Sequence, residues 1–346
     1  MRSHLCPASV FSSFYARFSI KGISENRGAW MRLAILDDYE GVALELADWG
    51  RLGPEIQIDV YQDTIKEEHI LADRLLPYHI LVIMRERTRF PRSLIERLSN
   101  LKLLVTTGNR NLAIDLAACK EKGIVVCGTD SSKTAAAELA WALILAVLRR
   151  IPQHDRAVRE GRWAETIGSG LDGKVLGVLG LGKLGAQVAR IGRAFGMQVI
   201  AWSQNLTAQR AAEVGVVRVE KNEFFATADV ISIHVVLSER TRGLVGAHEI
   251  GLMKSEAYLI NTSRGQIVEE KALIEALGKK RIAGAGLDVF EIEPLPPDHP
   301  FLTLDTIVLT PHIGYVTRQG FRTYFTDACA DVSAWLSGRP VRVLTH

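Results

Sequence analysis

Short apolar runs alternate with stretches of helical periodicity from Met31 onward. The runs before residue 130 are rich in leucine, isoleucine and valine, and the segments between them repeat apolar residues at helical spacing. Strands that alternate with helices are typical of a parallel sheet whose helices are the crossovers. The pattern therefore predicts a first α/β unit of five strands, near residues 33–36, 56–61, 80–84, 103–108 and 124–128.

A second series of the same kind begins at Lys174. It contains six strand candidates with helices between most of them, which is the pattern of a doubly wound α/β domain. The candidates are residues 174–180, 198–202, 229–236, 257–263, 282–289 and 306–312. Between the two series, a long apolar helix is predicted from about Ser132 to Arg149, with Ser131 and Thr134 as candidate caps.

A single amphipathic helix closes the chain after residue 312 and is predicted to end before Gly338 and Pro340. Its apolar face contains Phe321, Phe325, Ala328, Val332, Trp335 and Leu336. A lone terminal helix needs an existing core, and the first unit is its natural partner, so we expect the chain to cross between the two units twice. The predicted domains are residues 31–131 with 313–346, and residues 132–312.

Residues 1–30 are rich in serine and arginine, poor in acidic residues, and lack the unbroken apolar run of a secretory signal. We expect them to lie outside the fold. Two explanations stay open: an organellar transit-like peptide, or an upstream extension that is disordered or arises from a misassigned start. The four cysteines, Cys6, Cys119, Cys127 and Cys329, form no C-x-x-C pair. This scatter suits reduced thiols and predicts a cytoplasmic protein.

The charge balance argues against nucleic acid or an anionic membrane as a partner. The chain has 346 residues, 42 basic against 39 acidic, but residues 1–30 hold four of the basic residues and one acidic residue. Residues 31–346 therefore balance at 38 against 38, with no basic bias toward nucleic acid or an anionic membrane. The longest apolar stretch, residues 135–148, contains Glu138 and is too short to span a bilayer, so we expect a buried helix there.

A glycine-rich turn follows the first strand of the second series. Gly180, Gly182 and Gly185 form the pattern GxGxxG between an apolar run and a helical stretch, which is the context that a dinucleotide-binding turn requires. The first glycine permits the tight turn, the second lets the backbone approach a pyrophosphate, and the third lets the helix pack on the strand. The helix N-terminus would then face the anion with free N–H groups.

The end of the next strand decides which dinucleotide fits. A carboxylate there would bind the ribose 2′-hydroxyl of NAD, and a nearby arginine would favour the 2′-phosphate of NADP. This chain has Ser203 at that position, followed by glutamine and asparagine. Arg210 lies seven residues further on, inside a predicted helix, and is interpreted as a solvated surface charge. NAD and NADP both remain open.

Three polar residues follow at predicted strand ends: Arg264 in INTSRG, Glu293 in DVFEIEP and His312 in LTPHIG. An arginine beside a cofactor site is suited to bind a carboxylate through its two-pronged guanidinium. A histidine oriented by a glutamate is a typical acid–base residue. Each could instead be a surface or structural residue, but together, after a dinucleotide-binding turn, they indicate a catalytic site.

With these motifs, the chain resembles the D-isomer-specific 2-hydroxyacid dehydrogenase family over nearly all of residues 31–342. The resemblance rests on six ordered segments: TAAAELAWALILA, VLGVLGLGKLG, DVISIH with the following TRGLVG, NTSRGQIVEEKAL, AGAGLDVFEIEPLP and LTPHIGY. It implies two doubly wound parallel-sheet domains: a flavodoxin-like substrate (catalytic) domain and a Rossmann-type dinucleotide-binding domain. It also implies hydride transfer between a nicotinamide cofactor and a 2-keto or D-2-hydroxy acid, with no metal.

The resemblance assigns roles to individual residues. Arg264 would bind the substrate carboxylate and carbonyl, His312 would donate the proton in reduction, and Glu293 would pair with it. The cofactor would contact Gly180, Gly182, Lys183, Leu184, Gly185, Ser203, Thr262, Ser263, Asp288 and Gly314. The first domain would close over the substrate with Arg85, Gly108 and Asn109, although Arg85 could equally form a surface salt bridge.

Departures from the family pattern occur at Val236, where proline is usual, and at Tyr315, where a second glycine is common. Residues 84–87, Met-Arg-Glu-Arg, are unusually charged and would either pair internally or favour an acidic substrate. The family resemblance and the apolar helix at residues 135–148 also predict a homodimer.

Rival functions are a dinucleotide-sensing corepressor-like binding protein, and a phosphite or phosphoglycerate dehydrogenase. Glu293 argues against a formate enzyme, which typically carries glutamine there.

Overall fold

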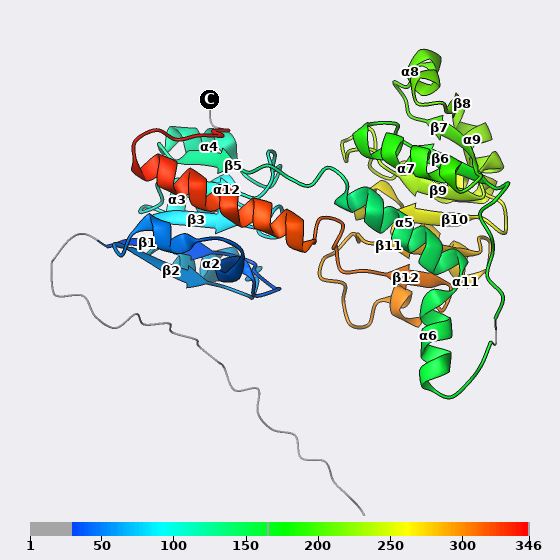
Figure 1. Ribbon diagram of the computed structural model, residues 1–346, viewed down its shortest axis with the longest axis horizontal. Helices are drawn as coiled ribbons and strands as arrows, with labels where there is room; N and C mark the ends of the chain where they lie inside the picture. Colours follow the sequence, from blue (N-terminus) through cyan, green and yellow to red (C-terminus); the bar gives the residue numbers. More distant parts are fainter. Residues whose placement is uncertain (1–29, 165, 345–346) are drawn as a thin grey trace, which may run out of the picture.

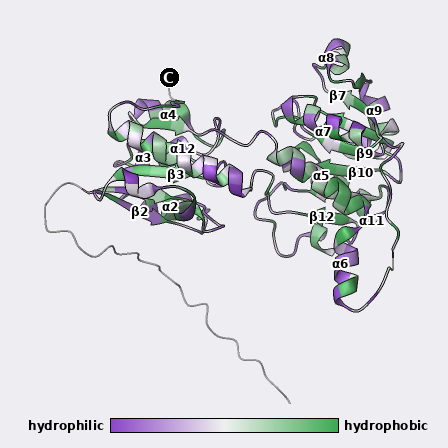
Figure 2. Cartoon of the chain, viewed as in Figure 1, coloured by the Kyte–Doolittle hydropathy of each residue, from purple (hydrophilic) through white to green (hydrophobic). Residues whose placement is uncertain are grey.

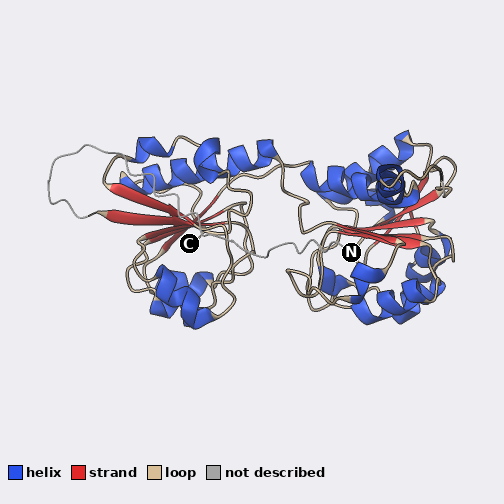
Figure 3. Cartoon of the chain, turned by 90° about the horizontal axis from the view of Figure 1, so that it is seen from below, coloured by secondary structure: helices blue, strands red, loops and turns tan. Residues whose placement is uncertain are grey.

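The computed structural model describes residues 30–164 and 166–344, which form two α/β domains joined by two crossings of the chain (Figure 1). The extension predicted over residues 1–30 lies, apart from Trp30, outside the described residues. In each domain, helices cover both faces of a central sheet (Figure 3). The predicted fold class, two parallel-sheet α/β domains, is confirmed.

The first sheet has five parallel strands in the order β2-β1-β3-β4-β5. This is the flavodoxin-like order, and the count agrees with the prediction. The strands are β1 (Met31–Ile35), β2 (Ile56–Val60), β3 (Ile80–Ile83), β4 (Leu103–Thr106) and β5 (Val125–Gly128). The helices between them are α1 (Ala43–Leu46), the 3₁₀ turn η1 (Trp49–Leu52), α2 (Glu68–Leu75), α3 (Arg92–Arg97) and α4 (Leu116–Glu121).

Neighbouring residues of these strands point to opposite faces of the sheet, so each strand contributes to two cores. On β3, for example, Ile80 and Val82 pack on one face, and Leu81 and Ile83 on the other. The four residues are buried, which is why β3 is a continuous apolar run with no polar alternation. Helices α2, α3 and α4 cover one face, and α1 and η1 cover the other.

The C-terminal helix α12 (Arg318–Leu336) returns to the first domain and completes that second face (Figure 1). Phe321, Phe325, Ala328 and Val332 are buried against the sheet as the periodicity predicts, and Leu336 stays exposed. Burial of large apolar side chains such as these stabilises a fold by roughly 1.5–3 kcal/mol each. The helix begins where the Thr317 hydroxyl accepts a hydrogen bond from the amide of Gly320.

The second sheet has seven parallel strands in the order β12-β11-β10-β9-β6-β7-β8. They are β6 (Val175–Leu179), β7 (Gln198–Trp202), β8 (Val217–Arg218), β9 (Val230–Ile233), β10 (Tyr258–Asn261), β11 (Gly284–Leu287) and β12 (Ile307–Leu309). The prediction of six strands was wrong by one. The missed strand, β8, has two residues at the sheet edge, too few to carry an apolar period.

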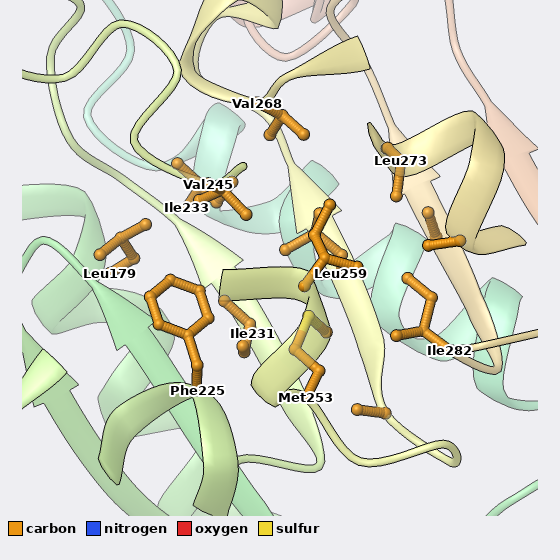
Figure 4. Close-up of a cluster of buried hydrophobic side chains, with 14 of the residues drawn as sticks. Leu179, Phe225, Ile231, Ile233, Val245, Met253, Leu259, Val268, Leu273 and Ile282 are labelled. Atoms are coloured by element: carbon orange, nitrogen blue, oxygen red, sulfur yellow. The ribbon is translucent and has the colours of Figure 1, made fainter. Parts of the chain in front are cut away.

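Helices α7 (Lys183–Ala194), α8 (Ala208–Glu213), α9 (Lys221–Thr227), α10 (Ala247–Leu252) and α11 (Glu270–Gly278) connect these strands, together with the 3₁₀ turns η2 (Gly265–Ile267) and η3 (Pro300–Thr303). Helices α9 to α11 build one apolar core against the sheet, shown in Figure 4 around Leu259. Helices α7 and α8 build the other core together with α5 (Ala135–Leu148).

Helix α5 (Ala135–Leu148) packs its apolar side chains into its own domain, among them Trp141, Leu143 and Leu148. On its outer side Ala142 is exposed and Leu139 and Leu145 are half-buried, and the homodimer expected from this helix stays a prediction. Of the two predicted caps, Ser131 and Thr134, Thr134 is the N-cap residue, but its side chain makes no capping hydrogen bond; the Ser132 hydroxyl accepts from the amide of Ala135 instead.

Exposed apolar side chains also occur on α6 (Ile151–Arg159), where Figure 2 shows both polar and apolar residues, and at positions 163 and 167 after it. Ile151, Val158, Trp163 and Ile167 are 51%, 54%, 81% and 93% exposed. Within the described parts of the chain, no helix combines the length and apolar character needed to cross a membrane.

Candidate active site

The glycine turn joins β6 to α7 as its spacing predicts. Gly180 has φ +99°, a left-handed conformation that glycine adopts without strain. A Cβ on Gly185 would lie 2.1 Å from the carbonyl oxygen of Gly180, so only glycine allows the helix to start this close to the strand. A Cβ on Gly182 would meet nothing within 4 Å. The backbone at the start of α7 is therefore open to an incoming pyrophosphate.

A hollow of about 450 Å³ opens beside this turn, at the carboxyl ends of β6, β7 and β9. Ligands of doubly wound sheets bind at such strand ends. It is lined by Gly180, Leu181, Gly182, Ser203, Asn205, Leu206, Arg210, Val235, Val236, Ser238, Arg240 and Thr241. Of the predicted cofactor residues, Lys183 is exposed on the first turn of α7, and Leu184 packs its side chain into the core.

Two arginines, Arg210 and Arg240, line this hollow. Arg210 was interpreted as a surface charge, and it does pair with Glu213, with Nη1 to Oε2 at 2.9 Å, but it also lines the hollow. Arg240 was not singled out from the sequence. It lies in the loop after β9, where neither an apolar period nor a motif shows which polar side chain faces inward.

His312 and Glu293 form the predicted pair, with Nδ1 to Oε2 at 2.7 Å. The second carboxylate oxygen of Glu293 accepts from the amide of Phe290 at 3.0 Å. Burial raises the pKa of Glu293, but the hydrogen bond and charge of His312 outweigh it, with further help from Arg264, and the pKa lies below its ordinary value. Because Nδ1 faces Glu293, Nε2 is the nitrogen available to a substrate.

Asp288 fixes the turn that carries His312. Its carboxylate is fully buried and accepts hydrogen bonds from the amides of Ile313 and Gly314, both at 2.8 Å, and from the hydroxyl of Thr310 at 2.6 Å. Burial raises the pKa of Asp288 above its ordinary value. His312 itself has φ +56°, which is uncommon outside glycine, so the turn depends on this support. Asp288 was predicted near the nicotinamide, and the contacts described for its carboxylate are with the protein.

Arg264 lies at the end of β10 and points between the domains. Its Nη1 donates to the carbonyl of Ser263 at 2.8 Å, and its Nη2 pairs with Glu86 of the first domain at 3.1 Å. The next residue, Gly265, packs directly on the backbone of Phe290, where a Cβ would lie 2.0 Å from the carbonyl carbon. This close approach brings Arg264 beside the loop that carries Glu293.

Neighbouring loops of the second domain are tied together at the same strand ends. The Ser263 hydroxyl donates to the carbonyl of Val235 at 2.5 Å. Thr262 is half-buried, and Gly314 is buried against Asp288. Thr262 and Ser263 therefore lie at the carboxyl ends of the strands, at the same edge of the sheet as the glycine turn.

The first domain brings Arg85 and Gly108 together. A Cβ on Gly108 would lie 2.1 Å from Nη1 of Arg85, so the guanidinium rests on the glycine. Asn109 is exposed, whereas the neighbouring Asn111 is buried and donates to the carbonyl of Arg85 at 2.6 Å and to the hydroxyl of Thr106 at 2.9 Å. Asn111 was missed because its role is to support the backbone.

The charged loop at residues 84–87 pairs within the protein. Arg87 forms two hydrogen bonds to Glu40, at 2.8 and 3.1 Å, and Glu86 pairs with Arg264. Among the described residues, Arg85 forms no ion pair, so the surface salt bridge considered for it is not present. Its guanidinium lies 5.6 Å from the ring centre of Tyr315, whose ring is also 5.9 Å from that of His312.

A doubly wound domain with this turn is typical of dinucleotide-dependent oxidoreductases. The chain belongs to the D-isomer specific 2-hydroxyacid dehydrogenases: the family model of their NAD binding domain matches residues 141–314. The predicted family, and NAD or NADP as its cofactor class, are confirmed. Arg264, Glu293 and His312 fall within the matched residues.

Relatives support the assignment. A D-3-phosphoglycerate dehydrogenase of Archaeoglobus fulgidus is 36% identical over 306 residues, which is 88% of this chain and 57% of that protein. The chain thus spans little more than half of that relative's length. A hydroxypyruvate reductase of Thermotoga maritima is 37% identical over 267 residues, 75% of this chain and 86% of that protein. A solved phosphoglycerate oxidoreductase of Vibrio cholerae, 36% identical, superposes with a TM-score of 0.84, covering 89% of this chain and 99% of that one.

Proposed function

We propose that the protein interconverts a 2-keto acid and a D-2-hydroxy acid, with NAD or NADP as hydride donor or acceptor. The observation that carries the proposal is the contact of 2.7 Å between His312 and the charged carboxylate of Glu293, beside Arg264 and on the same strand ends as the glycine turn. An acid–base group, a carboxylate-binding cation and a dinucleotide-binding turn are what this reaction needs.

In this proposal His312 protonates the carbonyl oxygen during reduction and removes the same proton during oxidation, through Nε2. The bound nicotinamide supplies or accepts the hydride. Glu293 keeps the imidazole oriented and stabilises its positive form. Asp288 holds the turn that carries His312, and so acts as a positioning residue for the acid.

Arg264 binds the substrate carboxylate and stabilises the charge that develops on the carbonyl oxygen. Arg85, Gly108 and Asn109 of the first domain complete the substrate site. Gly180, Gly182, Lys183, Leu184 and Gly185 bind the pyrophosphate, and Ser203 the adenosine ribose. Thr262, Ser263 and Gly314 lie near the nicotinamide.

The domain limits that we propose are residues 31–131 with 313–346 for the substrate domain, and residues 132–312 for the cofactor domain. The packing of α12 on the first sheet supports this division. A homodimer also remains part of the proposal, with the exposed apolar residues of α6 and the following segment as the contact. A cytoplasmic location rests on the cysteine pattern alone.

The substrate is proposed from the relatives. Hydroxypyruvate, glyoxylate and 3-phosphoglycerate are the compounds that the names of related enzymes indicate. No described feature favours phosphite oxidation or corepressor-like peptide binding over this reaction.

The test is replacement of the acid. In His312→Ala, turnover of 2-keto acids is expected to fall by about 10²- to 10⁴-fold, because general acid catalysis is lost while the cofactor site is intact. Steady-state assays of glyoxylate and hydroxypyruvate, with NADH and NADPH separately, measure the loss, and fluorescence titration measures cofactor binding. His248→Ala, an exposed histidine of α10, is the control and should keep wild-type rates. Equal activity in His312→Ala and wild type would contradict the assignment.

A further inference from the structure

The hollow beside the glycine turn contains two positive side chains and no carboxylate. Among its lining residues, the charged ones are Arg210 and Arg240. Ser203 occupies the end of β7, where a carboxylate would accept hydrogen bonds from ribose hydroxyls. Residues 31–346 carry equal numbers of basic and acidic residues, so two cations in one hollow do not follow from a general basic surface.

The adenosine ribose of NAD has no negative charge that would need these two cations. The pyrophosphate is shared by NAD and NADP and is met by the N-terminus of α7. The adenosine ribose of NAD carries neutral hydroxyls, which gain most from an acceptor such as a carboxylate. A ribose 2′-phosphate is a dianionic group near neutral pH, and it gains most from guanidinium groups and hydroxyl donors. The lining contains guanidinium groups and hydroxyls and no carboxylate, which suits the 2′-phosphate.

Arg240 is the better placed of the two cations. No described residue forms an ion pair with it, whereas Nη1 of Arg210 is bound to Glu213. Arg240 also lines a second, smaller hollow of about 140 Å³ that adjoins the first and shares Ser203, Asn205 and Thr241 with it. Arg240 therefore lines both hollows that adjoin the end of β7.

The loop that carries Arg240 is held by a compact set of hydrogen bonds. The Thr241 hydroxyl accepts from the amide of Ser238 at 2.8 Å and donates to the carbonyl of Val236 at 2.7 Å. The amides of Thr241 and Arg242 both donate to the carbonyl of Ser238, each at 3.0 Å. Because the loop is already ordered, less conformational entropy is lost when a cation on it binds an anion.

We propose that Arg240, assisted by Arg210 and Ser203, binds the 2′-phosphate of the cofactor, so that the protein prefers NADP(H) to NAD(H). This inference rests on the proposed function and specifies the cofactor of that same site.

The test compares the two cofactors on the full chain. Fluorescence titration of the wild type is expected to give a Kd for NADPH about tenfold or more below that for NADH, the size of one charge-assisted contact. In Arg240→Gln, the affinity for NADPH should fall by about tenfold while the affinity for NADH stays within about twofold. Arg242→Gln is the matched control, because Arg242 is exposed on the same loop and outside the hollow.

Ser203→Asp is a second variant. It adds a carboxylate at the end of β7 and leaves the loop that carries Arg240 unchanged. The new carboxylate should weaken NADPH binding by repulsion and strengthen NADH binding through the ribose hydroxyls, which reverses the preference. Thermal unfolding of each variant verifies that it is folded.

Two results would overturn the inference. One is a wild-type affinity for NADH equal to or greater than that for NADPH. The other is an equal loss for both cofactors in Arg240→Gln, which would place the guanidinium on the adenine ring that the cofactors share. If either result came with intact reduction of keto acids by NADH, the proposed function would stand and only the preference would fail. Failure to bind either cofactor would contradict both.

Discussion

At the scale of single residues, Glu293 influences His312 through charge as well as through geometry. The two side chains are 2.7 Å apart, and the pKa of Glu293 is held below its ordinary value by this partner in spite of partial desolvation. The carboxylate therefore stays negative from moderately acid to alkaline pH, where it stabilises the protonated form of the imidazole. A neutral amide in its place would keep the size of the side chain and lose this effect.

Glu293→Gln is accordingly expected to shift the pH profile of the reaction. Reduction needs the protonated imidazole, so its rate should decline at a lower pH in the variant than in the wild type. Oxidation needs the neutral imidazole, so its rate should persist to a lower pH. Measurements of kcat/KM against pH in both directions follow the shift. Glu291→Gln, an exposed neighbour, should give the wild-type profile, and superimposable profiles for Glu293→Gln would show that the pair has no catalytic role.

Among single residues, those with a backbone requirement were the easiest to predict. Gly180 has a positive φ, and Gly185 lies too close to the carbonyl of Gly180 for a Cβ. The GxGxxG spacing indicates both requirements. Arg240 and Glu86 were not predicted as site residues, because the direction of a charged side chain in a loop is set by tertiary contacts. Asp288 was found from the family pattern, but its hydrogen bonds to the turn of His312 became visible only in the folded chain.

At the scale of elements, helix α12 carries a buried carboxylate. Asp331 is fully buried, and both contacts from Arg342, at 3.0 and 2.9 Å, go to its Oδ1. Its Oδ2 has no hydrogen-bond partner within the described parts of the chain. Burial raises the pKa of Asp331 to about 7, against the opposing effect of Arg342. The helix therefore holds a proton that an unfolded chain would release near pH 4.

This proton makes the stability of the first domain depend on pH. A carboxyl group with a raised pKa in the folded state stabilises the fold while it is protonated, and the contribution is lost as pH rises from about 4 to about 7. Asp331→Asn removes this dependence. The free energy of unfolding of the variant minus that of the wild type should therefore increase by a few kcal/mol across this range, measured by urea denaturation at several pH values. A difference that is constant with pH would contradict the raised pKa.

The strands and helices themselves followed from the apolar pattern with few exceptions. The five strands of the first sheet and the return of α12 were predicted because buried parallel strands form continuous apolar runs and a lone amphipathic helix needs a core. Strand β8 was missed because two edge residues have no period. The homodimer expected from the apolar character of α5 stays a prediction, because a one-dimensional pattern does not show how much of a helix its own domain covers.

At the scale of the whole molecule, the exposed apolar residues predict how two copies associate. Trp163 and Ile167 are 81% and 93% exposed, and side chains of this kind on a protruding segment are typical of an interface. The wild type should elute with light scattering at twice its mass of 38.2 kDa. Trp163→Ser should shift the protein toward the monomer, while Ile70→Ser, an exposed apolar residue of the first domain, should not. A monomeric wild type at micromolar concentration would refute the dimer.

The pair between Arg264 and Glu86 also has a consequence for the whole molecule, because it joins the two domains at the point where substrate would bind. Before substrate enters, the guanidinium is already neutralised by a carboxylate of the protein. If Arg264 binds the substrate carboxylate as proposed, binding is an exchange of one anion for another, and its free energy is a difference between two ion pairs. A neutral molecule of similar shape could not replace Glu86 on the guanidinium, and it would gain less from this site.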